Sequence, residues 1–292
     1  MGLSLAPLGR SLAAATLVCV AACSQSPYTP AGSAQFVPSS DTVQIAYQAS
    51  GSGKPALVLI HGWSCDSSYW AGQVDELSKD FQVITMDLGG HGRSGTGRAN
   101  WTIDSFGEDV AAVVDRLRPE QVVLVGHSMG GDVAVAAARR LGGRVKGVVW
   151  VDTYQKLGGT RSAAEVEEIV APFASDFQPT TAAFVRGMFP SAADQELVNR
   201  VAEDMSSAPP TIAVSALRSS LTYGRSITET MKGVGPIVAI NPDQPAAGIE
   251  SMKRHGVHVV TMSGVGHFMM MEQPARFNAL LRAVVAEHFT SH

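Results

Sequence analysis

The feature that most restricts the fold is a series of short, β-branched apolar runs that alternate with helical segments. The runs cover residues 56–60, 81–86, 122–125, 145–151, 237–240 and 257–262, and residues 42–48 alternate as an edge strand would. Helical patterns cover residues 103–117, 128–141 and 277–289. Short apolar runs of this kind are typical of strands buried on both faces. The alternation predicts an α/β fold with a doubly wound, mostly parallel sheet, whose ligand sites lie at the carboxyl ends of the strands.

One interval interrupts this alternation. Residues 153–234 contain no clear buried strand, but they have helical patches at 163–170 and 194–205. Prolines that should break helices stand at positions 172, 179, 190, 209 and 210. We expect a helical cap inserted between two strands, with contacts that shape a substrate pocket.

Composition and charge are those of an ordinary globular domain. Of the 292 residues 45% are hydrophobic, and the length can bury a substantial core. The chain has 22 basic and 26 acidic residues, a net charge of −4 and no Lys/Arg block. Because nucleic-acid binding depends on a basic patch, we predict no nucleic-acid partner.

The first 40 residues differ from the rest of the chain. Residues 11–22 are an apolar, alanine-rich run, too short to span a bilayer comfortably, which follows the single basic residue Arg10. This is a secretory signal pattern, and its end, Val20-Ala21-Ala22-Cys23, resembles the lipobox of bacterial lipoproteins. The resemblance implies a signal peptide over 1–22, a lipid on Cys23 and a tether over 23–40. The folded domain then covers 41–292.

The expected location follows from this leader. A lipid on Cys23 would anchor the exported protein to the cell envelope, at the outer membrane if the source cell is Gram-negative. Plain secretion is the alternative, because many signal peptides end in small residues. If Cys19 is lost with the signal peptide and Cys23 carries the lipid, Cys65 is the one remaining thiol, so no internal disulfide could form.

The strongest chemical motif is Gly126-His127-Ser128-Met129-Gly130, which follows an apolar run and opens a helix of small residues. In that position a Gly-x-Ser-x-Gly pattern places the serine on a strained strand-to-helix turn that exposes its hydroxyl. The flanking glycines avoid collisions with the neighbouring chain. Ser128 is therefore a candidate nucleophile, although a glycine-rich structural turn is the alternative interpretation.

From about residue 42 onward the chain resembles the α/β-hydrolase superfamily. The segment around Ser128 is joined, in the family's order, by His61-Gly62-Trp63, by residues 87–94 (DLGGHGRS) and by residues 264–268 (GVGHF). The resemblance implies that His267 is the general base and that the main-chain N–H groups of Trp63 and Met129 form the oxyanion hole. It implies no metal and no organic cofactor. His61 and His127 are expected to pack or to form local hydrogen bonds.

Two carboxylates compete for the third catalytic position, which should lie between Ser128 and His267 in chain order. Many family members carry the acid in the loop that here reads Asn241-Pro242-Asp243-Gln244-Pro245, but Asp243 comes two residues early. Asp152 occupies the family's other placement, after the preceding strand. We favour Asp152 and keep Asp243 as the alternative acid.

These residues predict a serine hydrolase that cleaves a carboxylic ester or related small acyl substrate through an acyl-enzyme intermediate. An acyltransferase, a perhydrolase or haloperoxidase-type enzyme and a C–C hydrolase could use the same residues, and the fold does not separate them. A non-catalytic, lipid-anchored binding protein is an alternative of another class. The spacing of His255 and His258 is unlike that of a metal site, so no metal is predicted.

Overall fold

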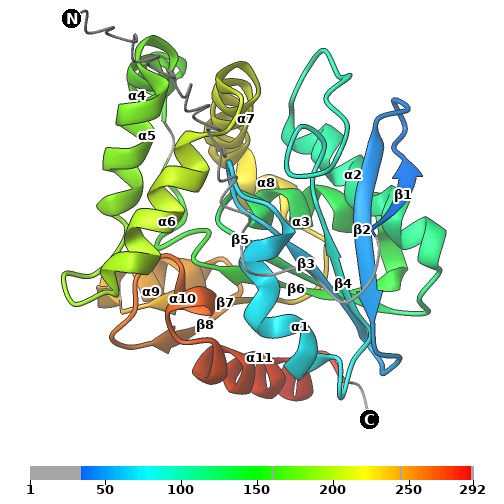
Figure 1. Ribbon diagram of the computed structural model, residues 1–292. Helices are drawn as coiled ribbons and strands as arrows, with labels where there is room; N and C mark the ends of the chain where they lie inside the picture. The colour runs from blue at the N-terminus through cyan, green and yellow to red at the C-terminus, as the bar shows by residue number, and fades with distance from the viewer. Residues whose placement is uncertain (1–33, 160, 244, 291–292) are drawn as a thin grey trace, which may run out of the picture.

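The computed structural model describes residues 34–159, 161–243 and 245–290, and within them eight strands form one sheet (Figure 1). The strand order is β1-β2-β4-β3-β5-β6-β7-β8. The β1–β2 and β2–β4 pairs are antiparallel and the remaining pairs are parallel. The predicted mostly parallel sheet is confirmed. The strands are β1 (Gln35–Pro38), β2 (Gln44–Ser50), β3 (Ala56–Ile60), β4 (Val83–Met86), β5 (Val122–His127), β6 (Val145–Val151), β7 (Ile237–Pro242) and β8 (Val257–Met262).

The sheet begins before residue 41, which corrects the predicted start of the folded domain. Strand β1 pairs antiparallel with β2, so that Phe36 lies opposite Ala46. The edge position predicted for residues 42–48 is also wrong, because β2 lies between β1 and β4. Only Val37 is buried in the four-residue β1, so its alternation is too short to stand out from a polar tether.

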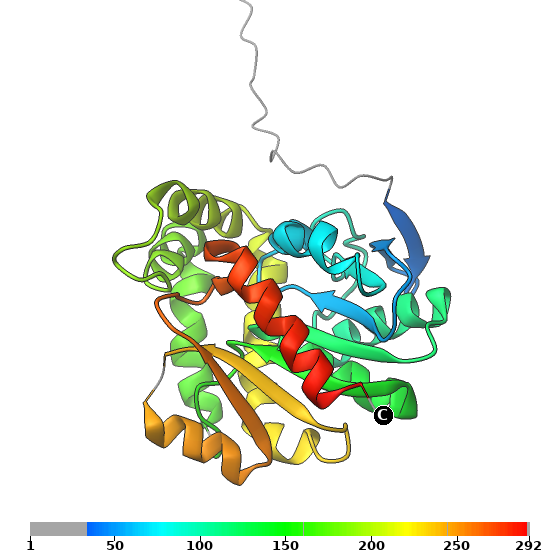
Figure 2. The ribbon, with the colours of Figure 1, turned by 90° about the horizontal axis from the view of Figure 1, so that it is seen from below.

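Helices cover both faces of the sheet (Figures 1 and 2). Helix α1 (Ala71–Leu77) packs with α11 (Pro274–His288), and α2 (Ile103–Leu117) packs with α3 (Met129–Leu141). Strands β3 and β5, between these layers, are buried along their whole length, which explains their continuous apolar sequence. The shorter helices of this part are η1 (Ser67–Trp70), η2 (Gly142–Arg144), α9 (Ala246–Arg254) and α10 (Met269–Glu272).

Helices also fill the chain between β6 and β7, where a cap was predicted. They lie beyond the carboxyl ends of the strands (Figure 1). One detail differs from expectation: Pro172 lies inside a helix that continues to Ser175, because the proline faces solvent, where a bend is tolerated. In the described part of this region the helices are α4 (Ala163–Ser175), α5 (Phe177–Arg186), α6 (Gln195–Ser206), α7 (Pro210–Tyr223), η3 (Gly224–Ser226) and α8 (Ile227–Thr230).

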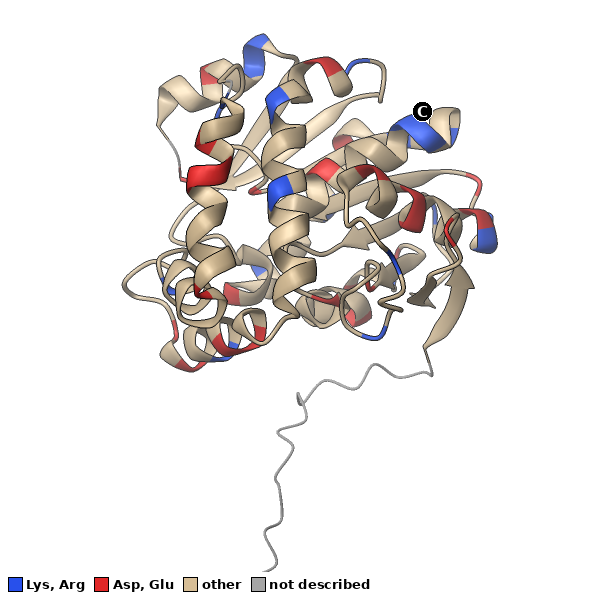
Figure 3. Cartoon of the chain, turned by 90° about the horizontal axis from the view of Figure 1, so that it is seen from above, with Lys and Arg blue, Asp and Glu red and all other residues tan. Residues whose placement is uncertain are grey.

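The predicted signal peptide, Cys23 and the tether as far as residue 33 lie outside the described residues and stay predictions. Over the described ranges, no helix combines the length and the apolarity that a membrane crossing requires. Figure 3 shows basic and acidic segments interspersed over the molecule.

A buried ion pair joins the β1–β2 turn to the layer of α2. Arg98 donates to Asp109 Oδ1 at 2.5 Å and to Asp41 Oδ2 at 2.6 Å. The Asp109 side chain is completely buried and also accepts from Ser39 Oγ and the Gly89 N–H. Burial raises the pKa of Asp109, and Arg98 opposes that rise. Arg98 is therefore the cation that makes this buried carboxylate tolerable.

Arg98→Met should lower the free energy of unfolding by about 3–5 kcal/mol, because it leaves a buried carboxylate without its cation. Urea denaturation of this variant measures the loss. The control is Arg116→Met, which removes an exposed arginine of α2 and should change stability by less than about 0.5 kcal/mol. Equal effects of the two substitutions would contradict this account of the cluster.

Candidate active site

Ser128 lies on the turn that joins β5 to α3. Its φ of 53° and ψ of −123° are unusual for a residue with a side chain. A Cβ at Gly126 would lie 2.1 Å from the Gly130 carbonyl oxygen, and a Cβ at Gly130 would lie 2.5 Å from that of Ile60. Only glycine fits at these two positions, because the main chains of β3, β5 and α3 meet there. The turn holds the Ser128 side chain at the carboxyl ends of the strands.

His267 follows β8 and bonds to the carboxylate of Asp152. The distance from His267 Nδ1 to Asp152 Oδ2 is 2.6 Å, and both side chains are largely buried. Because a carboxylate only accepts, Nδ1 carries the proton of this bond, and Nε2 is the ring nitrogen that Asp152 does not engage. Asp152 has a φ of 44°, and its N–H donates to the Ile240 carbonyl. This turn directs the carboxylate that follows β6 toward the imidazole.

Asp243, the other candidate acid, has different surroundings. It is exposed, and its Oδ1 accepts a hydrogen bond from Ser263 Oγ at 2.9 Å. The structure therefore brings Asp152, and not Asp243, to His267. Both residues follow strands that end at the same edge of the sheet, which is why the sequence pattern alone leaves the choice open.

Three contacts hold the loop that carries His267. The Gly266 N–H donates to both carboxylate oxygens of Glu272, and the His267 N–H donates to the Met188 carbonyl of the cap. The third contact joins His127 Nε2 to the His267 carbonyl oxygen at 3.0 Å. Burial holds the pKa of His127 well below its ordinary value, so the ring is neutral and Nε2 carries the proton that it donates. His127 thus reaches beyond its own motif, and so does His61, which bonds to the Gly62 carbonyl beside it and also accepts from the N–H of Leu88, 27 residues along the chain.

Trp63 and Met129 line a cavity of about 240 Å³ together with Ser128 and His267. The Trp63 indole N–H donates to the Ala213 carbonyl of α7 at 2.7 Å, and the ring packs edge-on against Phe173 of α4. Met129 is the first residue of α3, where the main-chain N–H groups have no partner within the helix. The other lining residues are mostly apolar and include Phe184, Met188, Met205, Leu217 and Phe268.

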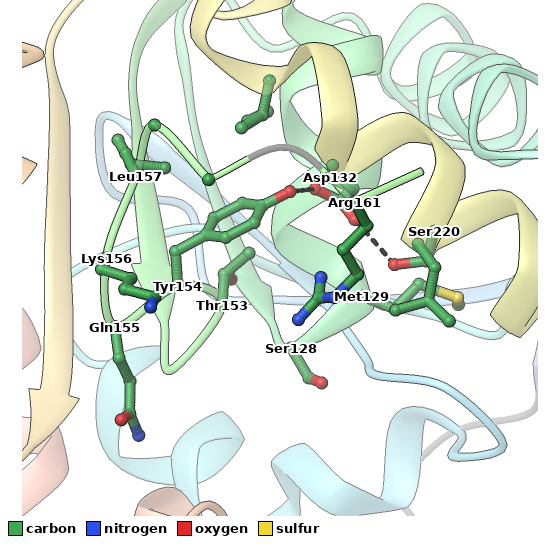
Figure 4. A pocket seen from close by; sticks show the side chains of 15 residues that line it. Ser128, Met129, Asp132, Thr153, Tyr154, Gln155, Lys156, Leu157, Arg161 and Ser220 are labelled. Carbon is green, nitrogen blue, oxygen red and sulfur yellow. Dashed lines mark hydrogen bonds between the residues drawn. The ribbon is translucent and has the colours of Figure 1, made fainter. Parts of the chain in front are cut away.

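A second cavity, of about 510 Å³, also reaches Ser128 (Figure 4). Asp132 lines it and is only 3% exposed. Its carboxylate accepts from the Tyr154 hydroxyl at 2.5 Å and from Ser220 Oγ at 2.7 Å. Burial raises the pKa of Asp132 to about 7, although both hydroxyl groups oppose the rise. The site predicted from the sequence did not include Asp132. Its signal in the sequence is an acid placed one helical turn after Ser128 in a helix of small apolar residues.

Cys65 also lines the smaller cavity and is buried. Burial raises the pKa of its thiol well above the ordinary value, so the S–H stays protonated and contacts the Trp63 carbonyl. Across the residues that the structure describes, no group of three or more His, Cys, Asp or Glu side chains has the arrangement of a metal site.

Comparison with known proteins identifies the family. Residues 55–222 match the family model of the alpha/beta hydrolase fold, and the chain belongs to that family. A non-heme haloperoxidase from Rhodococcus erythropolis is 41% identical over 118 residues, which are 40% of this chain and 43% of that protein. A pimeloyl-acyl-carrier-protein methyl ester esterase from Nitrosomonas europaea is 36% identical over 107 residues, 37% of this chain and 40% of that protein. The chain thus matches less than half the length of either relative.

The fold extends over most of the described chain. A thermophilic esterase from Thermogutta terrifontis superposes with a TM-score of 0.76 at 23% identity, covering 89% of this chain and 100% of that one. The fold, the family model and the relatives together place the chain in a family of enzymes that includes esterases.

Asp132→Asn should change how stability depends on pH. The native carboxyl holds its proton up to about pH 7, whereas an unfolded one loses it near 3.8. The parent should therefore lose up to about 4 kcal/mol of unfolding free energy between those pH values through this group. The variant lacks this loss, so its stability relative to the parent should rise with pH.

Urea denaturation at several pH values measures this difference. The matched control is Asp75→Asn, at an exposed position of α1, which should follow the parent at every pH. A constant difference between Asp132→Asn and the parent across the range would show that Asp132 is ionised at all of these pH values.

Proposed function

We propose that this protein is a serine hydrolase that cleaves a carboxylic ester or a related small acyl substrate. The observation that carries the proposal is the 2.6 Å hydrogen bond between His267 and Asp152, beside a serine held on a strained strand-to-helix turn. A serine hydroxyl becomes a nucleophile when a base can take its proton, and that base needs an acid to fix its tautomer. Asp152 supplies that acid by binding the Nδ1–H of His267.

The geometry supports a two-step reaction. Ser128 Oγ attacks the ester carbonyl while Nε2 of His267 takes its proton, and Asp152 stabilises the imidazolium that forms. The N–H groups of Trp63 and Met129 bind the developing oxyanion. His267 then gives the proton to the departing alcohol, and the acyl group stays on Ser128. In the second step His267 activates a water molecule that releases the acid.

One relative supports a second candidate on the same residues. The protein that is 41% identical over 118 residues is a non-heme haloperoxidase. If hydrogen peroxide replaced water in the second step, the acyl group would leave as a peracid. Product analysis with peroxide and with competing alcohols separates hydrolysis from perhydrolysis and from acyl transfer.

Ser128→Ala should reduce hydrolysis of p-nitrophenyl acetate and butyrate to the uncatalysed background, because it removes the hydroxyl that forms the acyl-enzyme. Release of p-nitrophenol by the full-length chain is the measurement. Ser191→Ala, at an exposed cap position, is the control and should retain the parent rate. A folded parent with no activity above Ser128→Ala on esters of any chain length would refute the proposal.

Asp152→Asn should lower kcat by about 10²–10⁴-fold, because an amide favours the wrong tautomer of His267. Asp243→Asn should stay close to the parent, because Asp243 bonds to Ser263 and not to the imidazole. Steady-state kinetics of the two variants on one ester decide between the acids. A larger loss in Asp243→Asn would reassign the acid.

A further inference from the structure

Ser128 lies where two cavities of different chemistry meet. Both cavities include Ser128, Met129, Thr153, Ser220 and Leu221. The smaller one contains His267 and Trp63 and is otherwise mainly apolar. The larger one contains neither of these residues and has a polar wall that includes Asp132, Tyr154 and Ser220 (Figure 4).

The reaction assigns the two parts of an ester to these cavities, an assignment that rests on the proposed function. The departing alcohol oxygen must lie near His267, which protonates it, and the carbonyl oxygen must lie near the N–H groups of Trp63 and Met129. Both requirements place the alcohol and the oxyanion in the smaller cavity. The acyl chain, which leaves the carbonyl carbon in the remaining direction, therefore extends into the larger cavity.

A hydrogen-bond acceptor, the carboxylate of Asp132, lies in the wall of the larger cavity. Asp132 follows Ser128 by one turn of α3, about 6 Å along the helix axis. Tyr154, from the loop after β6, and Ser220, from α7, each donate to one of its carboxylate oxygens. A carboxylate oxygen has more than one lone-pair direction, so both can accept a further hydrogen bond. Three separate elements thus hold one acceptor group in the wall of the cavity.

We propose that this cavity is an acyl subsite for chains that carry a hydrogen-bond donor, a hydroxyl or an ammonium group, at the end remote from the ester carbonyl, and that Asp132 is the acceptor. A simple alkyl chain would leave the buried carboxylate facing a methyl group. Asp132 keeps its two hydroxyl donors in either case, so the selectivity comes from the remaining lone pairs, which only a donor-bearing chain would satisfy.

The charge on Asp132 determines which donor is preferred. Below about pH 7 the carboxyl is largely neutral, and above that pH its charge favours an ammonium group. Removal of the Tyr154 hydroxyl should raise the pKa of Asp132 further, because that hydroxyl stabilises the ionised form. The other titratable or charged groups near this cluster are the exposed lining residues Lys156 and Arg161, Tyr223 on α7, and Asp104 on α2 and Arg139 on α3, which both act on Tyr223.

The test measures hydrolysis of four p-nitrophenyl esters by the full-length chain. The esters are the heptanoate, the 6-hydroxyhexanoate, the 6-aminohexanoate and the monoester of hexanedioic acid. The first three differ only in their terminal methyl, hydroxyl or ammonium group. We expect kcat/KM for the two donor esters to exceed that for heptanoate by about 10- to 100-fold at pH 8. The carboxylate ester should be the poorest, because Asp132 repels it.

Variants connect the preference to Asp132. Asp132→Asn should lower the ratio of kcat/KM for 6-aminohexanoate over heptanoate and remove its dependence on pH, whereas Asp75→Asn should keep the parent ratio. In the parent this ratio should rise with a midpoint near pH 7. In Tyr154→Phe the midpoint should move to higher pH, a shift that a merely structural role would not produce. Tyr154→Phe therefore still tests the role of Asp132 if Asp132→Asn fails to fold.

The remaining outcomes would contradict either the subsite assignment or the proposed function. If the parent hydrolyses heptanoate as well as the donor esters, or prefers the carboxylate ester, the subsite assignment is wrong while the proposed hydrolase function stands. If the parent hydrolyses p-nitrophenyl acetate or butyrate but none of these four esters faster than Ser128→Ala does, the subsite assignment fails alone. If it hydrolyses none of the six esters, the proposed function fails, and the subsite fails with it.

Discussion

Ser128 keeps its positive φ because main-chain atoms pack closely around the turn on both sides of it. The carbonyl oxygens of Ile60 and Gly130 lie where side chains at Gly130 and Gly126 would otherwise stand. Strain of this kind costs about 1–3 kcal/mol and persists only where the surrounding structure determines it. Here β5 is completely buried and α3 is buried along most of its length, so their packing offsets the strain. The position of the hydroxyl is thus a property of the sheet rather than of a flexible loop.

The other groups of the site come from distant parts of the chain and are fixed by main-chain contacts. The Ser128 N–H donates to the Val151 carbonyl, so the residue after Val151 is held next to the turn. That residue, Asp152, donates its own N–H to Ile240 of the next strand, and His127 holds the carbonyl of His267. The relative positions of hydroxyl, imidazole and carboxylate therefore depend on the pairing of β5, β6 and β7. A substitution that shifts this pairing should disturb the site even where it touches none of these side chains.

What could be predicted from the sequence was local or periodic. The turn at Ser128 follows from five adjacent residues, and the buried strands follow from continuous apolar runs. The sequence favoured Asp152 but could not exclude Asp243, because both follow strands at one edge and only the backbone turn at Asp152 directs a carboxylate toward His267. Strand β1 is too short to show a pattern. Asp132 gains its partners from residues 22 and 88 positions away, which no local pattern reveals.

Two carboxyl groups lie near Ser128, and their partners differ in a way that separates their chemistry. Asp152 receives an imidazole N–H, a donor that can become cationic during a reaction, so its negative charge is useful there. Asp132 receives only neutral hydroxyl groups and is almost wholly buried, and burial raises its pKa to about 7. A carboxyl with that pKa contributes little to taking a proton from a serine one helical turn away, but it can distinguish a donor from a methyl group in a bound chain. In the proposed mechanism and subsite, the same side-chain chemistry thus serves the reaction at one position and the selection of substrate at the other, and the surrounding donors decide which.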